Sequence, residues 1–407
     1  MRKIWIVAIS VLMVAACRKD RFVPIPSPPG PIDSGGVVLP DTFLTQDIYK
    51  VVSYNIPRTP AEILLSPYVF ANQNSAGRVM VFNERGQLMK EKETPGATFC
   101  FRRWVVNGKV RYTYIVNDIN TTHIAGINQL TGYAVIADEN LNEIKKVYLQ
   151  THNDIVAGAG YVGLDVHEFI LLDDDHYISM AYYPKTVSNI PAALNPNPNL
   201  QVVACVIQEV QNGQVIWQWD GTNYPEFYTT SVEGNDYTNA TVPQDYMHLN
   251  SITVDPRDNN LICSFRHLDQ VLKIDRQNGN ILWRLGGTNS NFPLSTTQIF
   301  LRQHNATLIN NSTLLLFDNG ELNSRPYSRI LEMELNETTR TVTAFKSFNV
   351  PEPFSQYMGS VQKFGENYFI GGGTGNYALE INAQTKARNI EFLSDQSSYR
   401  AYKYELK

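Results

Sequence analysis

Residues 248–287, HLNSITVDPRDNNLICSFRHLDQVLKIDRQNGNILWRLGG, divide into four short apolar segments separated by polar turns. The segments are 249–256, 260–267, 270–276 and 281–287, and the turns between them are rich in Asp, Asn, Gly and Pro. Apolar runs of this length between such turns predict β-strands joined as hairpins. We therefore predict that this stretch forms one four-stranded antiparallel sheet.

A similar string of strand, polar turn and strand recurs along the chain. The copies follow one another at intervals of roughly 50 to 70 residues, which is typical of propeller blades with four strands each. The sequence therefore predicts an all-β fold, a six-bladed β-propeller with four-stranded antiparallel blades. The six copies are at 78–89, 132–144, 203–217, 270–283, 329–342 and 377–390.

Composition narrows the choice of partners and of chemistry. The chain has 407 residues, 43% of them hydrophobic and 18% charged, and its net charge is −5. It contains no block of Lys or Arg, so we expect no nucleic-acid partner. Cys100, Cys205 and Cys263 lie in apolar, strand-like strings without metal-type spacing. We expect small buried hydrophobic residues there, and a Cys205–Cys263 disulfide is the alternative.

The N-terminus has the features of a bacterial lipoprotein signal. Arg2 and Lys3 precede an apolar run that is too short to span a bilayer, and Val-Ala-Ala-Cys at 14–17 looks like a lipobox. We expect residues 1–17 to be a signal peptide and Cys17 to carry the lipid. Because residue 18 is not Asp, we expect an outer-membrane anchor in a Gram-negative bacterium, facing the periplasm or the cell surface.

Two further segments complete the predicted organisation of the chain. Residues 18–42 are rich in Pro and Gly and have no periodicity, so they are expected to form an extended tether. Residues 43–407 are expected to form the propeller, which would be the catalytic domain.

Strand direction places several polar residues at one end of the predicted propeller. The first strand of each blade lines the central channel, and the second strand runs antiparallel to it. The beginnings of first strands and the ends of second strands therefore lie at the same mouth. The residues are His167, His248, Asn250, Gln303 and His304 at strand beginnings, and Tyr182, Arg266, Asp318, Asn319 and Thr374 at strand ends.

Three of these residues are histidines in successive blades, which suits either nucleophilic and acid–base chemistry or a metal site. Their expected neighbours are Arg266 and amides rather than carboxylates, so we favour an anion site and expect no metal. Strand alternation predicts that the side chain of His267 lies on the opposite face of its strand from Arg266.

The connection before His248, residues 221–247, is unusually long for a propeller. Long loops in compact folds are usually functional or disordered. We expect it to border a slot for an aromatic ring, and the alternative is that its rings stack on the outside of a blade. These rings are Tyr224, Phe227, Tyr228, Tyr237 and Tyr246.

Three strings resemble the bacterial arylsulfate sulfotransferases, β-propeller enzymes that move a sulfuryl group between phenols without an activated nucleotide. They are DVHEF at 165–169, the stretch 248–287, and QHNATLINNSTLLLFDNG at 303–320. The resemblance covers residues 160–320 well and the other blades loosely. It implies a small-molecule aryl sulfate and a phenol as partners, and no cofactor.

The family also has two features that this chain lacks. Some members carry an extra N-terminal β domain, whereas only enough residues for one edge strand precede the first predicted blade. Those members also have a disulfide close to the nucleophile, whereas no cysteine is near His304 in this sequence.

The resemblance also implies roles for individual residues. His304 would be the nucleophile that becomes transiently sulfated, and His248 would be the proton shuttle. By analogy with phosphoryl transfer, charge spreads over the equatorial oxygens, so cationic and amide donors matter most. A covalent intermediate predicts ping-pong kinetics. The residues that would hold the sulfate are His167, Asn250, Arg266 and Thr374.

A non-enzymatic function remains the alternative, because propellers host many functions. In that case the protein would be a surface lipoprotein that binds a glycan or a protein partner. The sequence also leaves open the physiological donor and acceptor, and whether the chain is a homodimer.

Overall fold

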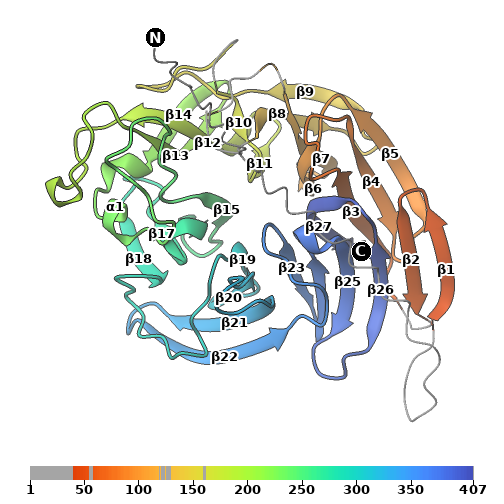
Figure 1. Cartoon of the computed structure of the whole chain (residues 1–407). Coiled ribbons are helices and arrows are strands. Elements are labelled where there is room, and N and C mark those ends of the chain that lie inside the picture. The colour runs from red at the N-terminus through yellow and green to blue at the C-terminus, as the bar shows by residue number, and fades with distance from the viewer. Residues whose placement is uncertain are drawn as a thin grey trace, which may run out of the picture.

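The computed structural model describes residues 40–54, 58–118, 120, 124, 130–158 and 162–406. Six sheets stand around a central axis (Figure 1), which confirms the six-bladed, all-β propeller. The predicted signal peptide with Cys17, and the predicted tether as far as residue 39, lie outside the described residues. Within the described ranges, no helix is both long and apolar enough to cross a membrane.

Four blades are built from consecutive strands that run from the channel to the outside. One comprises β6 (Thr98–Val106), β7 (Lys109–Asn117), β8 (Thr131–Ala137) and β9 (Glu143–Val147), and β10 (Leu164–Asp165) also pairs with β8. The next comprises β11 (Phe169–Asp173), β12 (His176–Thr186), β13 (Gln201–Gln211) and β14 (Gln214–Asp220). The third comprises β15 (Leu249–Val254), β16 (Leu261–Phe265), β17 (Gln270–Ile274) and β18 (Ile281–Gly286). The fourth comprises β19 (His304–Leu308), β20 (Thr313–Asp318), β21 (Arg329–Asn336) and β22 (Thr341–Asn349).

The two remaining blades join the ends of the chain. The last strand, β27 (Ser397–Glu405), pairs with β3 (Ala61–Tyr68) and so closes the ring. That blade continues through β4 (Gly77–Asn83) and β5 (Leu88–Thr94). The other comprises β23 (Ser360–Phe364), β24 (Asn367–Gly371), β25 (Tyr377–Asn382) and β26 (Arg388–Leu393).

The residues before the first blade form a hairpin rather than a single edge strand. Strand β1 (Pro40–Gln46) pairs with β2 (Tyr49–Tyr54), and β2 pairs with the outer strand β26. The N-terminal segment therefore extends the outer edge of the last blade to six strands.

The described helices are single turns. Two of them matter for the site: the turn η3 follows β16, and the helix α1 lies in the long connection before β15. They are η1 (Ala192–Leu194), η2 (Gly221–Asn223), α1 (Phe227–Thr230), η3 (Arg266–Leu268) and η4 (Gly373–Gly375).

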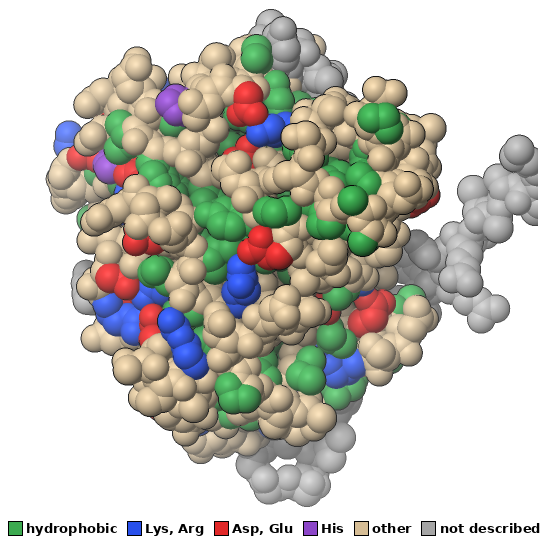
Figure 2. All heavy atoms as spheres, turned by 90° about the vertical axis from the view of Figure 1, so that its left-hand side faces the viewer, with side chains coloured by type: hydrophobic (Ala, Val, Ile, Leu, Met, Phe, Trp, Pro, Cys, Tyr) green, Lys and Arg blue, Asp and Glu red, His purple; other side chains and the backbone are tan. Residues whose placement is uncertain are grey.

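The hydrophobic core lies between neighbouring blades, because both faces of each sheet pack against another sheet. One cluster, for example, joins Val203 and Cys205 of β13 to Leu249 of β15 and Phe265 of β16. Cys100, Cys205 and Cys263 are buried free thiols, as predicted, and no Cys205–Cys263 disulfide forms. On the side of the molecule in Figure 2, apolar, acidic and basic side chains are interspersed.

Candidate functional site

Two of the predicted histidines lie against each other at one mouth of the channel. His167 precedes β11 and His248 precedes β15, and their ring centroids are 5.1 Å apart. Both rings also contact Tyr182 of β12, at 5.5 and 5.4 Å. Residues from two blades therefore meet here, as strand direction predicted.

His304 begins β19 and lies buried beside these groups. Burial lowers its pKa well below 6.5, and the charges of Arg266, His167 and His248 lower it further. A hydrogen bond to Asn319 only partly offsets these effects. The imidazole of His304 is therefore neutral near pH 7, which a nitrogen nucleophile requires.

The hydrogen bonds of Asn319 decide which nitrogen of His304 carries the lone pair. The Nδ2 group of Asn319 donates to the main-chain oxygens of Ser355 and Met358, both at 2.8 Å. Its Oδ1 atom is therefore the acceptor that faces Nδ1 of His304, at 2.8 Å. The second neighbour of Nδ1 is also an acceptor, the main-chain oxygen of Arg302 at 3.2 Å. The hydrogen of the neutral ring must be on Nδ1, and the lone pair on Nε2.

The other two histidines are oriented by carboxylates. Nδ1 of His167 lies 2.6 Å from Oδ1 of Asp165, and Nδ1 of His248 lies 2.7 Å from Oδ2 of Asp245. Burial alone would raise the pKa of Asp245, but His267 and His248 hold it well below its usual range. The ionised carboxylate of Asp245 accepts a hydrogen from Nδ1 of His248. His248 is thus suited to carry a proton, and His304 to attack.

These carboxylates correct one prediction. We expected amides rather than carboxylates beside the histidines, and used that to disfavour a metal. In fact Asp245, His248 and His267 bring ligand atoms within 4.8 Å of one another, whereas His167, His248 and His304 form no such group among the described residues.

The Asp245 group nevertheless fits a metal ion poorly. The rings of His248 and His267 are stacked, with centroids 4.4 Å apart and planes at 28°. A metal must lie close to the plane of each imidazole that binds it, and two stacked rings do not aim their Nδ1 atoms at one point. Both Nδ1 atoms already have acceptors, namely the carboxylate and the main-chain oxygen of Asp245.

The prediction for His267 was also wrong. Strand β16 ends at Phe265, and Arg266–Leu268 form the single turn η3. Side chains no longer alternate between two faces there, so the ring of His267 turns toward the mouth and stacks on His248.

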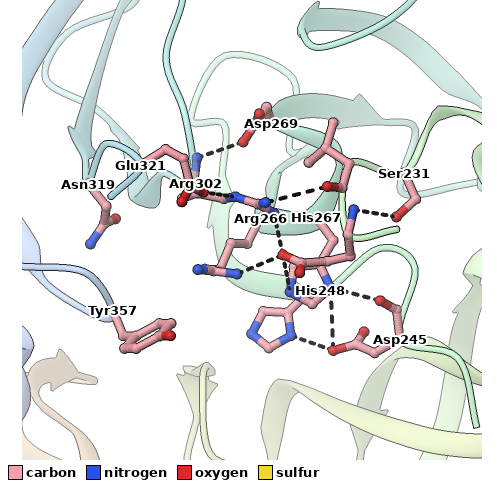
Figure 3. A network of polar contacts seen from close by, with 12 residues as sticks. Ser231, Asp245, His248, Arg266, His267, Asp269, Arg302, Asn319, Glu321 and Tyr357 are labelled. Atoms are coloured by element: carbon pink, nitrogen blue, oxygen red, sulfur yellow. Dashed lines mark hydrogen bonds and ion pairs between the residues drawn. The ribbon is translucent and has the colours of Figure 1, made fainter. Parts of the chain in front are cut away.

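Arg266 presents an uncommitted edge to the site. Its Nη1 atom donates to Oε1 of Glu233 at 3.1 Å, and its guanidinium lies 5.2 Å from the ring of Tyr357. Its Nε atom is buried and has no hydrogen-bond partner in the described part of the chain. The guanidinium end away from Glu233 points toward the space between Asn319 and Tyr357 (Figure 3). This end of the guanidinium is suited to bind an anion in that space.

Asn250 and Thr374 use their polar groups within the protein. Asn250 is fully buried, and its Nδ2 atom donates to the main-chain oxygen of Gln303 at 2.7 Å. The hydroxyl of Thr374 bonds to the main-chain oxygen and nitrogen of Tyr357, both at 3.2 Å. The structure therefore places Asn250 behind His304 and Thr374 behind Tyr357, and in neither case directs these donors to the mouth.

The long connection borders the site, but not through its aromatic rings. Phe227, Tyr228, Tyr237 and Tyr246 are at most 4% exposed and belong to a hydrophobic cluster that they share with strands of two blades. Tyr224 stacks on Trp219 of β14. The loop meets the mouth through its acidic residues, Glu233 and Asp245.

Sequence reasoning missed Asp165, Asp245, Glu233 and Arg302. The first two had a signal, because an Asp precedes His167 by two residues and His248 by three. Glu233 and Arg302 had no such signal, because neither belongs to a strand whose direction could be read.

One protein family matches most of the chain. The model of the family described as Arylsulfotransferase (ASST) matches residues 106–405. No curated protein matches the chain.

Solved structures show looser likenesses. A protein of unknown function from Bacteroides caccae is 11% identical, with a TM-score of 0.45, and the match covers 86% of this chain and all of that one. A nidogen/laminin complex chain is 12% identical, with a TM-score of 0.43 and coverage of 85% and 98%. AztD from Citrobacter koseri is 8% identical, with a TM-score of 0.40 and coverage of 85% and 98%.

Proposed function

The chain belongs to the arylsulfotransferase family, and from this premise we propose that it moves a sulfuryl group from an aryl sulfate to a phenol through a sulfohistidine on His304. One observation carries the proposal: a neutral imidazole with its lone pair on Nε2 lies beside a buried, uncommitted guanidinium edge. The first group can attack sulfur, and the second can hold the sulfate oxygens.

In the first half-reaction, the sulfuryl group moves from the donor to the enzyme. The free edge of Arg266 binds two oxygens of the sulfate monoanion, since a guanidinium presents parallel donors to such a pair. Nε2 of His304 attacks sulfur, the bond between sulfur and the aryl oxygen breaks, and the imidazolium of His248 protonates the leaving phenolate. The products are a phenol and sulfated His304.

In the second half-reaction, the sulfuryl group moves from the enzyme to the acceptor. The hydroxyl of an acceptor phenol gives its proton to His248, its oxygen attacks sulfur, and the bond to His304 breaks. A phenol has a pKa of about 10 and an imidazole one of about 6.5, so His248 can give and take this proton near neutral pH. Ionised Asp245 accepts the Nδ1 hydrogen of His248.

The remaining predicted residues support these steps. His167, oriented by Asp165 and lying beside His248, binds a sulfate oxygen in its imidazolium form, because only then does Nε2 also carry a hydrogen. Asn250 is a positioning residue that fixes the backbone ahead of His304. Thr374 is a positioning residue that holds Tyr357 against Arg266.

A lipid anchor is part of this proposal. We infer from the lipobox that Cys17 is acylated and holds the propeller at the outer membrane, facing the periplasm or the cell surface. Membrane fractionation tests this: the natural chain should sediment with outer membranes, and the Cys17→Ala variant should not. An equal distribution of the two proteins would contradict it.

The function is tested by supplying p-nitrophenyl sulfate with and without phenol. Nitrophenolate release that requires phenol and is lost in His304→Ala supports transfer. Sustained release without an acceptor would indicate a sulfatase instead. No release from a panel of sulfate esters would favour the alternative, a propeller that binds a glycan or a protein. Loss of release in the presence of a chelator would favour a metal site instead.

A further inference from the structure

Two guanidinium groups lie at the mouth, but they differ in how many of their nitrogens already have hydrogen-bond acceptors within the protein. Arg302 precedes His304, and its Nε atom donates to Oε2 of Glu321 at 2.9 Å. Its Nη1 atom bonds to Oε1 of Glu233, and its Nη2 atom donates to the main-chain oxygen of Val232. All three nitrogens of Arg302 are therefore occupied, whereas Arg266 gives only Nη1 to Glu233 and keeps its other edge.

Glu233 is the carboxylate that both guanidiniums share. Its Oε1 atom accepts from Arg266 and Arg302 and lies 3.3 Å from Nε2 of His267. The backbone holds it there, because the N–H of Val232 donates to the main-chain oxygen of His267 at 2.8 Å. The side chain of Glu233 is 29% exposed, so it lies at the rim of the mouth.

At pH 8 the guanidinium and carboxylate charges around this cluster sum to −1, because Asp269 is ionised above its pKa of about 6. Arg266 and Arg302 carry two positive charges, and Glu233 and Glu321 carry two negative ones. Asp269 also faces the cluster and accepts the main-chain N–H of Arg302 at 2.6 Å, and burial raises its pKa to about 6. An anion at the mouth therefore finds one open guanidinium edge and no surplus of positive charge.

Sulfate and phosphate monoesters differ in charge rather than in shape. A phosphate monoester has a second pKa of about 6, so at pH 8 it is close to a dianion. A sulfate monoester carries a single negative charge. The additional charge of the phosphate would lie close to Glu233 without a cation to offset it, and like charges at short range repel.

From this arrangement, and on the basis of the proposed function, we propose that Glu233 makes the site selective for monoanionic sulfate esters over dianionic phosphate monoesters. It does so because its carboxylate offsets the positive charge of Arg302 and occupies the Nη1 group of Arg266. Its loop thus acts as a specificity element rather than as a wall for the aromatic ring.

The test compares the binding of phenyl phosphate and phenyl sulfate to the His304→Ala protein, which cannot be sulfated, with and without Glu233→Gln, by calorimetry at pH 8 and pH 5. Removing one negative charge should tighten phenyl phosphate binding at pH 8 by at least about tenfold. Phenyl sulfate binding should tighten less, so the preference for sulfate shrinks. At pH 5, where the phosphate is mostly a monoanion, the two ligands should respond alike.

Glu334→Gln is the matched control, because Glu334 is exposed on β21. This substitution removes the same charge at a position away from the mouth. It should leave the preference unchanged. If Glu233→Gln does not fold, Glu321→Gln serves instead, since it frees Nε of Arg302 and should shift the preference in the same direction.

Two results would overturn the proposal. One is an unchanged ratio of phosphate to sulfate affinity in folded Glu233→Gln at pH 8. The other is equal weakening of both ligands, which would show that Glu233 only positions Arg266. Selective sulfate binding by a wild type that never becomes sulfated on His304 would leave this proposal intact and refute the proposed function.

Discussion

Oδ1 of Asn319 accepts the Nδ1 hydrogen of His304 at 2.8 Å, and the amide of Asn319 is held in that orientation by two main-chain carbonyls. An amide fixes the tautomer without adding charge. His248, by contrast, has a carboxylate at the same ring position. This difference separates the two roles that we propose, attack by His304 and proton transfer by His248.

Replacing Asn319 by Asp should therefore change the pH dependence of His304 sulfation. The pKa of His304 lies well below 6.5, so the wild-type ring stays neutral between pH 6 and 8. An adjacent carboxylate favours the imidazolium and should move the acid limb of the single-turnover rate up by about one pH unit or more. Asn311→Asp, an exposed change in the turn after β19, is the control. An acid limb that stays in place would contradict the assignment.

Replacing Arg266 by Lys should strongly reduce turnover, although the positive charge is kept. Lysine lacks the two parallel donors that bind an oxygen pair, and loss of one transition-state donor typically costs about 10²–10³ in rate. We expect kcat/KM for aryl sulfates to fall by this amount in steady-state assays. Arg85→Lys, at an exposed position, should have no effect. Activity of Arg266→Lys within about threefold of wild type would exclude a bidentate role.

Replacing His248 by Gln should have an effect that depends on the leaving group. Acid–base assistance contributes about two to four orders of magnitude when the leaving group needs a proton. We expect a large loss of sulfation rate with phenyl sulfate and a small one with p-nitrophenyl sulfate, whose phenolate leaves unprotonated. Equal losses for both donors would show that His248 has another role.

The fold also depends on a buried ion pair below the site. Arg400 of β27 and Glu168 are both nearly inaccessible, with Nη1 and Oε2 2.8 Å apart, and Arg400 also donates to the main-chain oxygen of Asn250. Arg400→Met leaves the buried carboxylate of Glu168 with Arg102, 3.0 Å away, as its cationic partner, and should lower the free energy of unfolding by up to about 3–5 kcal/mol. Denaturant titration measures this loss.

The double variant Arg400→Met/Glu168→Leu should recover part of that stability, because the buried carboxylate is gone and only the partly exposed Arg102 loses its partner. Lys145→Met breaks an exposed pair with Asp175 and should cost at most about 1 kcal/mol. A loss of that same small size for Arg400→Met would show that the pair does not support the blade.

The parts of the site that lie just beyond the ends of strands could be predicted from the sequence. His167, His248, Arg266 and Asn319 follow from antiparallel pairing within a blade, which fixes where each strand begins and ends. His267 was wrongly placed because β16 ends two residues earlier than the predicted segment, and a turn has no alternating faces.

The contacts made by loops could not be predicted in the same way. Glu233 lies at the mouth because a long connection packs its aromatic rings into the core between two blades, and no periodicity encodes that path. Those aromatic residues look equally suited to a substrate slot and to a core, because both require large apolar rings. Only the packed structure distinguishes these alternatives.

The most direct test is mass spectrometry of the protein after incubation with an aryl sulfate alone. The account predicts one added sulfuryl group, located on the peptide that contains His304 and lost when a phenol is supplied. Transfer that proceeds with no adduct, or that survives in His304→Ala, would contradict it.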